Sequence, residues 1–218
     1  MDPTSLSQSQ KSSRSGGKKI ALYKSPKKSL WSPTAIHRFI RHEYQPGWVS
    51  VPNGTAMDAG INFRLDRTPG NAELSTLFDQ YRIVKAVVRI MARQGPGGAT
   101  GNVTNVADLY MGRYFGVEDP DDALPPGSTN TLMQYNKVKQ ARWNEDMVFT
   151  VYPHVNIDSA TTAVGAGDFM SVKSPWLDMA NTSVQHYGLK FHSDVNTQTF
   201  NLEFDYKITY YIECKVSR

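Results

Sequence analysis

The sequence contains very little cysteine and no long apolar segment. Its 218 residues include one cysteine, Cys214, which excludes an intramolecular disulfide framework and is typical of a reducing compartment. No run of eighteen apolar residues occurs, so we predict no membrane insertion. The N-terminal residues also lack the apolar core of a secretory signal peptide. With 39% hydrophobic residues the chain can bury one sizeable core, and we expect one domain preceded by a tail.

The motifs of the common enzyme classes are missing as well. The segment GPGGATG has glycines at 95, 97, 98 and 101, which do not fit G-x-G-x-x-G, so we interpret it as a connector between strands. The histidines show no metal-ligand spacing, and His186 and His192 fall on the polar side of an alternating segment, where surface positions are expected. No G-x-S-x-G elbow occurs, and Cys214 lies among apolar strand positions. We therefore predict no catalytic residue, no cofactor and no enzyme activity.

An acidic segment, EDPDD at residues 118–122, has the oxygen ligands that hard cations prefer. Its spacing does not match a calcium-binding loop, and Pro120 indicates a turn. We therefore favour a solvated acidic loop and predict no metal site.

Positive charge is concentrated at the start of the chain. Residues 1–42 hold nine lysines and arginines and one acidic residue, which gives a net charge of +8. Residues 43–218 hold fifteen lysines and arginines and nineteen acidic residues, which gives −4. This asymmetry predicts a polyanionic partner bound by the N-terminal part, with nucleic acid as the leading candidate.

We predict a basic, low-complexity arm over residues 1–37 and a β-rich domain over residues 38–218. The arm holds too few apolar residues to offset the entropy of ordering, so it should be disordered by itself. Because lysine and arginine neutralise phosphates and aromatic rings stack on unpaired bases, the predicted nucleic-acid contacts are Lys11, Arg14, Lys18, Lys19, Lys24, Lys27, Lys28, Trp31, Arg38 and Arg41. A candidate nuclear import signal consists of Lys18, Lys19, Lys24, Lys27 and Lys28. The alternative for the arm is a solubilising tail without a ligand.

Apolar and polar residues alternate with a period of two through much of the body. The clearest instance is residues 200–216, in which the even-numbered residues are apolar and the odd-numbered residues are mostly polar. Such a pattern predicts a β-strand with one buried face, and it is hard to reconcile with a helix. Further strands are predicted at residues 57–65, 106–117, 147–151 and 186–192.

Another strand is predicted within LFDQYRIVKAVVRIMARQ, residues 77–94. Its β-branched residues favour a strand over a helix. The residues predicted to face the core are Val84, Ala86, Val88, Ile90 and Ala92. The opposite face carries Lys85, Arg89 and Arg93, which are available either to a nucleic acid or to acidic groups of an adjacent strand or subunit. A short helical turn in NAELSTLFDQY precedes this strand.

Roughly eight strands, long polar loops and little helix predict an all-β fold. We favour an eight-stranded antiparallel jelly-roll β-sandwich over an immunoglobulin-type sandwich. The loops also contain large apolar residues that suit contacts between subunits, namely Tyr114, Phe115, Leu124, Trp143, Trp176 and Leu177. The same residues could instead close the ends of the sandwich.

The layout resembles a known protein family. The string F-D-Q-Y-R-I-x-K-x-x-V (Phe78–Val88), the C-terminal FDYKITYYIECK and the basic arm are similar to capsid proteins of circovirus-like viruses, whose small circular single-stranded DNA genomes encode a replication initiator. The likeness of pattern extends over most of residues 38–216. The arm differs from the longer arginine runs of the best-known members, because it is rich in lysine and serine.

The resemblance implies a coat protein that self-assembles into a small icosahedral shell (T=1) of about sixty copies around single-stranded DNA. It implies a location in the virion and, during assembly, in the host nucleus. The expected partners are other copies of the chain, the DNA genome, a host nuclear import receptor and a cell-surface receptor. The alternative is a β-domain protein that binds single-stranded nucleic acid without forming a shell.

Overall fold

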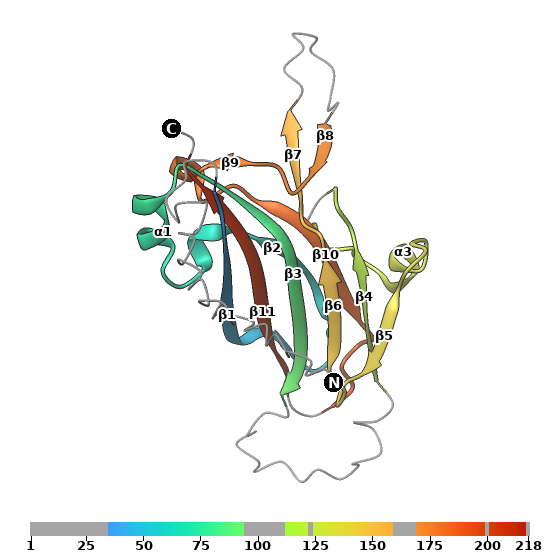
Figure 1. Cartoon of the computed structure of the whole chain (residues 1–218). Helices are drawn as coiled ribbons and strands as arrows, with labels where there is room; N and C mark the ends of the chain where they lie inside the picture. Colours follow the sequence, from blue (N-terminus) through green and yellow to red (C-terminus); the bar gives the residue numbers. More distant parts are fainter. Residues whose placement is uncertain (1–34, 94–111, 122–123, 159–168, 199–200, 217–218) are drawn as a thin grey trace, which may run out of the picture. The chain divides into compact units, whose positions relative to one another are not determined.

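The computed structural model describes residues 35–93, 112–121, 124–158, 169–198 and 201–216. They form two packed antiparallel sheets (Figure 1). Sheet A contains, in spatial order, β1 (Ile36–Val51), β11 (Leu202–Lys215), β3 (Gln80–Arg93) and β6 (Met147–Val151), and β9 (Leu177–Asp178) also pairs with β3. Sheet B contains β5 (Lys139–Arg142), β4 (Arg113–Glu118), β10 (His186–Ser193), β7 (His154–Asp158) and β8 (Phe169–Lys173), and β2 (Asp58–Phe63) pairs with β10.

The order of the strands is that of a jelly roll. Eight of them form two four-stranded layers, β1-β11-β3-β6 and β5-β4-β10-β2, in which neighbours in space are mostly far apart in sequence. The added hairpin β7–β8 extends from the β10 side of sheet B (Figure 1). The predicted fold class is confirmed. The first described strand begins at Ile36, two residues before the start predicted for the β-rich domain.

Among the described residues, four short helical segments accompany the strands. They are the 3₁₀ turns η1 (Leu65–Arg67) and η2 (Met179–Asn181) and the helices α1 (Asn71–Leu77) and α3 (Thr129–Leu132). The helical turn predicted in NAELSTLFDQY corresponds to α1 and ends one residue before Phe78. Among the described residues, no helix has the length and apolar character needed to cross a membrane.

The core lies between the two sheets and is built by the alternating residues of the long strands. From β11, Phe204, Ile208, Tyr210 and Ile212 are at most 1% exposed, as the period-two pattern predicts. The sheets approach closely at Gly116 of β4, where an added Cβ would lie 2.7 Å from the Phe149 ring and 2.8 Å from the Phe191 ring. A side chain here would therefore displace core aromatics, which explains a glycine in the middle of a strand.

Side chains as well as backbone hold β1 against β11. The carboxylate of Glu43 accepts hydrogen bonds from the hydroxyls of Tyr206 (2.5 Å) and Tyr210 (2.6 Å). Burial, together with the Glu43 charge, raises the pKa of both tyrosines. The phenols therefore stay protonated and keep donating to Glu43, so this polar group inside the sandwich is satisfied.

One residue of β3 departs from the predicted alternation. The pairing with β11 shifts between Tyr211 and Ile212, which lie opposite Lys85 and Ile83, so Val84 is the extra residue of a β-bulge. Ile83 is 0% exposed and takes the core position, whereas Val84 is half-buried. The prediction that Val84 faces the core is thus wrong. Ala86, Val88 and Ile90 are buried as predicted, and Ala92 is partly buried against the core.

A second bulge reverses the alternation in β10. Its pairing with β2 shifts between Tyr187 and Leu189, so that Gly188 is the extra residue. As a result His186 points into the core beside the Tyr81 ring and is 0% exposed, and the prediction of a surface position for it is wrong. His192 lies beyond the bulge and pairs with Asp58 at 3.2 Å.

The burial of His186 predicts a pH-dependent stability. Burial lowers the pKa of His186 from 6.5 to about 4, against the opposing effect of the Val184 and Phe63 carbonyls. Below pH 6.5 the unfolded chain takes up a proton that the folded chain does not accept until about pH 4, so stability falls as the pH is lowered through this range. Urea unfolding should show that His186→Gln removes about 2 kcal/mol of the stability loss between pH 7.5 and pH 5. Parallel pH profiles for the two proteins would contradict this assignment.

Candidate nucleic-acid interface

Most of the predicted nucleic-acid contacts, and the whole candidate import signal, lie outside the described residues. These are Lys11, Arg14, Lys18, Lys19, Lys24, Lys27, Lys28 and Trp31. Of the remaining candidates, Arg38 and Arg41 lie in β1, and Lys85, Arg89 and Arg93 lie in β3.

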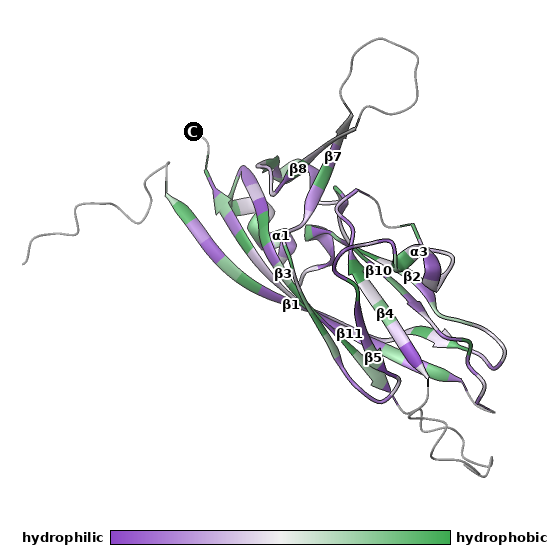
Figure 2. Cartoon of the chain, turned by 90° about the vertical axis from the view of Figure 1, so that its right-hand side faces the viewer, coloured by the Kyte–Doolittle hydropathy of each residue, from purple (hydrophilic) through white to green (hydrophobic). Residues whose placement is uncertain are grey.

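The side of sheet A that faces away from the core is rich in cations, and we call it the basic face. Purple and green bands alternate along β1 in Figure 2, because polar and apolar residues are mixed along this strand, and its outward side carries both Arg38 and Ile40. The cations of the basic face on β1, β3 and β11 are Arg38, Arg82, Lys85, Arg89, Arg93, Lys207 and Lys215. The carboxylates on the same strands and face are Glu203, Asp205 and Glu213, which leaves a net charge of +4.

Arg41 does not belong to the basic face. It lies on the opposite side of β1, where its guanidinium is 5.4 Å from the centre of the Phe39 ring and close to Gly70 at the start of α1. The two predicted arginines of β1 therefore point to opposite sides of sheet A, because their separation of three residues is odd.

Glu213 is a buried ionic centre of the basic face, 7% exposed. Its Oε1 accepts from Arg38 Nε at 2.9 Å, and its Oε2 accepts from Arg82 Nε at 2.9 Å and Nη2 at 2.6 Å. Burial alone would raise the pKa of Glu213, but the hydrogen bonds and charges of Arg82 and Arg38 outweigh it and lower that pKa. The register brings these three residues together, because Arg38 and Arg82 both lie directly opposite Glu213.

The other carboxylates of this region are also engaged. Arg89 donates through Nε to Asp146 Oδ2 at 2.8 Å, and Arg93 lies 3.9 Å from Glu203. Asp205 accepts from the Tyr44 hydroxyl at 2.8 Å and from the Gly47 amide at 2.7 Å. In the isolated subunit, Arg89 and Arg93 therefore pair with acidic groups of the same chain, which is one of the two alternatives that the sequence left open.

Three cations of the basic face and one at its margin lie over aromatic rings. Lys85 Nζ is 4.0 Å from the centre of the Tyr211 ring, and Lys173 Nζ is 4.1 Å from that of Tyr152. The Trp176 ring carries both Arg82 (4.6 Å) and Lys215 (4.5 Å). Such contacts hold the cations over flat apolar surfaces. A lysine that lies over a ring and has no carboxylate partner among the described residues remains available to phosphate.

Sequence reasoning did not name Arg82, Lys207, Lys215, Tyr152 or Tyr211 as parts of this surface. The alternation of β11 places Lys207 and Lys215 on its polar face, which was a usable signal. Arg82 joins the face through the bulge at Val84, which has no signal in the local sequence. Tyr152 follows β6 on its exposed side, so the alternation of residues 147–151 was a usable signal.

A hollow of about 490 Å³ opens in the basic face next to the bulge. Its lining is mainly apolar and comes from all four strands or their ends: Arg38, Phe39 and Ile40, Val84 and Lys85, Tyr152, and Tyr211, Ile212 and Glu213. This volume falls within the range of ligand-binding clefts.

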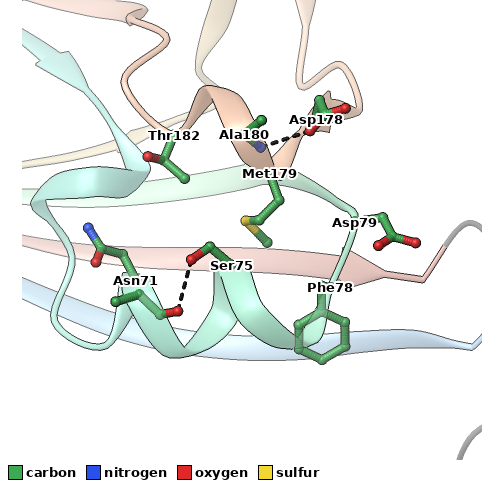
Figure 3. A pocket seen from close by; sticks show the side chains of 9 residues that line it. Asn71, Ser75, Phe78, Asp79, Asp178, Met179, Ala180 and Thr182 are labelled. Carbon is green, nitrogen blue, oxygen red and sulfur yellow. Dashed lines mark hydrogen bonds between the residues drawn. The ribbon is translucent and has the colours of Figure 1, made fainter.

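A larger hollow of about 770 Å³ lies between α1 and η2 (Figure 3). Asp79 and Asp178 line it, and Asp178 Oδ1 accepts a hydrogen bond from the Ala180 amide. No lysine or arginine is among its described lining residues. The polar lining with two aspartates offers no feature that favours phosphate, so we do not assign this hollow to a nucleic acid.

Half of the residues predicted as subunit contacts are buried within the subunit. Tyr114, Phe115 and Trp143 are 0%, 5% and 4% exposed, so the prediction that they supply exposed contact surface is wrong. Tyr114 and Trp143 belong to the main core of the sandwich, and the Tyr114 hydroxyl donates to the Glu145 carbonyl at 2.6 Å. Phe115 packs in a second cluster with Val117 and Leu132. Leu124 is 69% exposed. Trp176 and Leu177 are half-buried.

The acidic segment at 118–122 contains a buried ion pair. Asp119 Oδ2 lies 2.8 Å from Lys190 Nζ and accepts from the Tyr135 hydroxyl at 2.7 Å. Burial tends to raise the pKa of Asp119, but the bonds from Lys190, the Asp121 amide and Tyr135 lower it overall. Within the part of the chain that the structure describes, no cluster of three acidic, histidine or cysteine side chains could hold a metal ion.

The family model of the circovirus capsid protein matches residues 30–218. The chain belongs to the circovirus capsid protein family. As a capsid protein it is a structural component of a virion. The predicted family is thereby confirmed.

Two solved structures are similar to this capsid protein. A crystal structure of the 60-mer BFDV capsid protein has a TM-score of 0.62 and 17% sequence identity, and the match covers 85% of this chain and 96% of that one. A crystal structure of the decameric BFDV capsid protein has a TM-score of 0.54 and 17% identity, with 83% and 99% covered. At this identity the likeness shows a shared fold. A comparison with curated protein sequences found no match.

The arrangement around Glu213 predicts how much this ion cluster stabilises the subunit. Glu213→Gln removes a charge that two arginines surround, so we expect a loss of about 1–3 kcal/mol in the free energy of unfolding at pH 7.5. Because the pKa of Glu213 is lowered in the folded chain, its contribution is present above the usual carboxyl range and is lost as the pH falls through the lowered pKa. The difference between variant and wild type should therefore shrink in acid.

Urea unfolding at pH 7.5 and pH 3.5 measures this effect. The matched control is Glu203→Gln on the same strand, whose carboxylate lies 3.9 Å from Arg93 and is more exposed. It should cost about 0.5 kcal/mol or less. Equal losses for the two variants, or a Glu213→Gln loss that persists at pH 3.5, would refute the special role of Glu213.

Proposed function

We propose that this capsid protein assembles into a closed icosahedral shell of about sixty copies and packages single-stranded DNA. The observation that carries the proposal is the family match over residues 30–218. The fold shared with a BFDV capsid protein crystallised as a 60-mer supports the copy number. Sixty identical subunits in closed symmetry give a T=1 shell, in which each subunit makes the same set of contacts.

The charge distribution supports the packaging of a polyanion. Residues 1–42 carry a net charge of +8, so sixty subunits would bring about 480 positive charges from this region. The basic face adds +4 per subunit. In this proposal the basic face lines the interior of the shell, where Lys85, Lys207 and Lys215 contact phosphates and the arginine pairs exchange carboxylate for phosphate.

The arm has a second proposed role in the host cell. Lys18, Lys19, Lys24, Lys27 and Lys28 form two short basic clusters separated by a few residues, which suits recognition by a nuclear import receptor. Import before assembly would bring the capsid protein to a single-stranded DNA genome in the nucleus. Attachment to a cell-surface receptor completes the proposed partners.

A β-domain protein that binds single-stranded nucleic acid without forming a shell remains the second candidate. The basic arm and the aromatic rings of the basic face favour it, since neither requires a shell. The two candidates differ in assembly state.

The shell proposal predicts particles. Recombinant full-length protein should elute from size-exclusion chromatography far ahead of a 24.4 kDa monomer and show uniform round particles in negative-stain images. Burial of apolar surface between subunits drives this assembly, and screening of the arm charges by salt assists it. If only monomers or dimers form under every salt and pH condition, the shell proposal is wrong and the second candidate function stands.

The proposal for the arm predicts that the protein loses its bound nucleic acid when the arm is removed. Deleting residues 1–32 should abolish co-purifying nucleic acid and leave a folded body, because charge and core lie in different parts of the chain. For the intact protein, the log–log dependence of single-strand affinity on salt should have a slope of about −4 to −6. Replacing Lys18, Lys19, Lys24, Lys27 and Lys28 by glutamine keeps the length of the arm and should reduce this slope by about 3 to 4. An unchanged slope, or nucleic acid still bound to the truncated protein at moderate salt, would contradict the assignment.

A further inference from the structure

We propose that the hollow beside the Val84 bulge is a binding site for an unpaired nucleobase of the packaged strand. This inference rests on the proposed function. The arm and the basic face attract the phosphates of the strand, and the hollow binds one of its bases.

The hollow follows one row of side chains across sheet A. Ile40 of β1 lies opposite Tyr211 of β11, and Tyr211 lies opposite Lys85 of β3. Tyr152 continues the row, because it follows Val151, which pairs with Ala86 next to Lys85. The four strands thus present two aromatic rings and an aliphatic wall within a single hollow of about 490 Å³.

The lining fits a flat apolar ring. Ile40 and Tyr152 are 54% and 46% exposed, so the isolated subunit leaves a sizeable apolar surface open to water in the middle of a charged face. Val84, displaced from the core by the bulge, adds a further apolar group. Tyrosine rings and aliphatic side chains of this kind bind bases by stacking and by contact with the π-face.

The positive charges around the hollow favour a ligand in which the flat ring is attached to an anionic group. Lys85 and Lys173 lie over its two tyrosines, and the Arg38 side chain is 82% exposed at its edge. Glu213 is the one carboxylate among the described lining residues, and Arg38 and Arg82 already hold both of its oxygens. A purely apolar side chain of another subunit would supply no negative charge to these cations. A nucleotide supplies both parts, the base for the hollow and a phosphate for Lys85 or Arg38.

Every base presents a π-face, so a site of this kind is tolerant of sequence. That property suits a coat protein that covers a whole genome. Stacking of one base strengthens binding by about 5- to 150-fold relative to a strand that has the same phosphates and no base at that position.

The test compares two oligonucleotides that differ in bases and share the same backbone charge. Binding of a short oligo-dT and of an abasic oligonucleotide of equal length is measured by fluorescence anisotropy at one moderate salt concentration. The full-length wild type should prefer oligo-dT by about 5-fold or more. Tyr152→Leu and Tyr211→Leu should lose most of this preference and keep the affinity for the abasic strand. The matched control is Tyr187→Leu on sheet B, which should keep the preference.

The outcomes separate this inference from the proposed function. If neither oligonucleotide binds, packaging through the basic regions fails. If both bind equally well to the wild type, the proposed function stands and the base site is refuted. If Trp31→Leu abolishes the preference and Tyr152→Leu does not, the base stacks on the arm instead. If Tyr152→Leu changes the assembly state in size-exclusion chromatography and leaves the preference intact, the hollow is a contact between copies of the chain and the inference is wrong.

Discussion

The pairing of β11 with β1 on one side and with β3 on the other fixes both faces of sheet A at once. Residues Leu202–Lys215 alternate strictly, so the register that buries Phe204, Ile208 and Ile212 also places Lys207, Glu213 and Lys215 on the opposite side. A slip of one residue would expose the core residues and bury the charges. The jelly roll and the basic face therefore depend on the same constraint, and neither can change without the other.

Burial and charge act together on that basic face. Glu213 remains ionised at the centre of sheet A because two arginines hold it, which offsets the cost of desolvating its carboxylate. The other carboxylates are engaged as well. Asp205 accepts hydrogen bonds from Tyr44 and Gly47. The remaining two pair with Arg89 and Arg93. The lysines differ, because Lys85 and Lys215 lie on aromatic rings and form no ion pair with a carboxylate of the described residues. A polyanion meets these lysines without first breaking an ion pair, and for this reason we assign the phosphate contacts to them before the arginines.

The β-bulges at Val84 and Gly188 account for two differences between the simple alternating pattern and the observed structure. At Val84 the extra residue turns Arg82 and Lys85 to the same side and leaves an apolar hollow between β1 and β6. At Gly188 the extra residue turns His186 into the core, where an uncharged imidazole is required. One bulge thus shapes a candidate ligand site, and the other buries a histidine whose pKa is lowered. Both are departures from period-two order in strands that otherwise follow it.

The sequence by itself determined the class of fold, the family and the separation of a basic arm from a β-rich body, because alternation, motif strings and charge asymmetry are local properties. It also placed Lys85, Arg89 and Arg93 on the outward side of their strand. Only the tertiary structure decided the positions of Val84 and His186, since a bulge depends on the partner strand. It likewise decided that Tyr114, Phe115 and Trp143 are internal and that Arg38, Arg82 and Glu213 meet. Cross-strand register joins residues as far apart in sequence as Ile36 and Lys215, and no pattern within one segment contains that information.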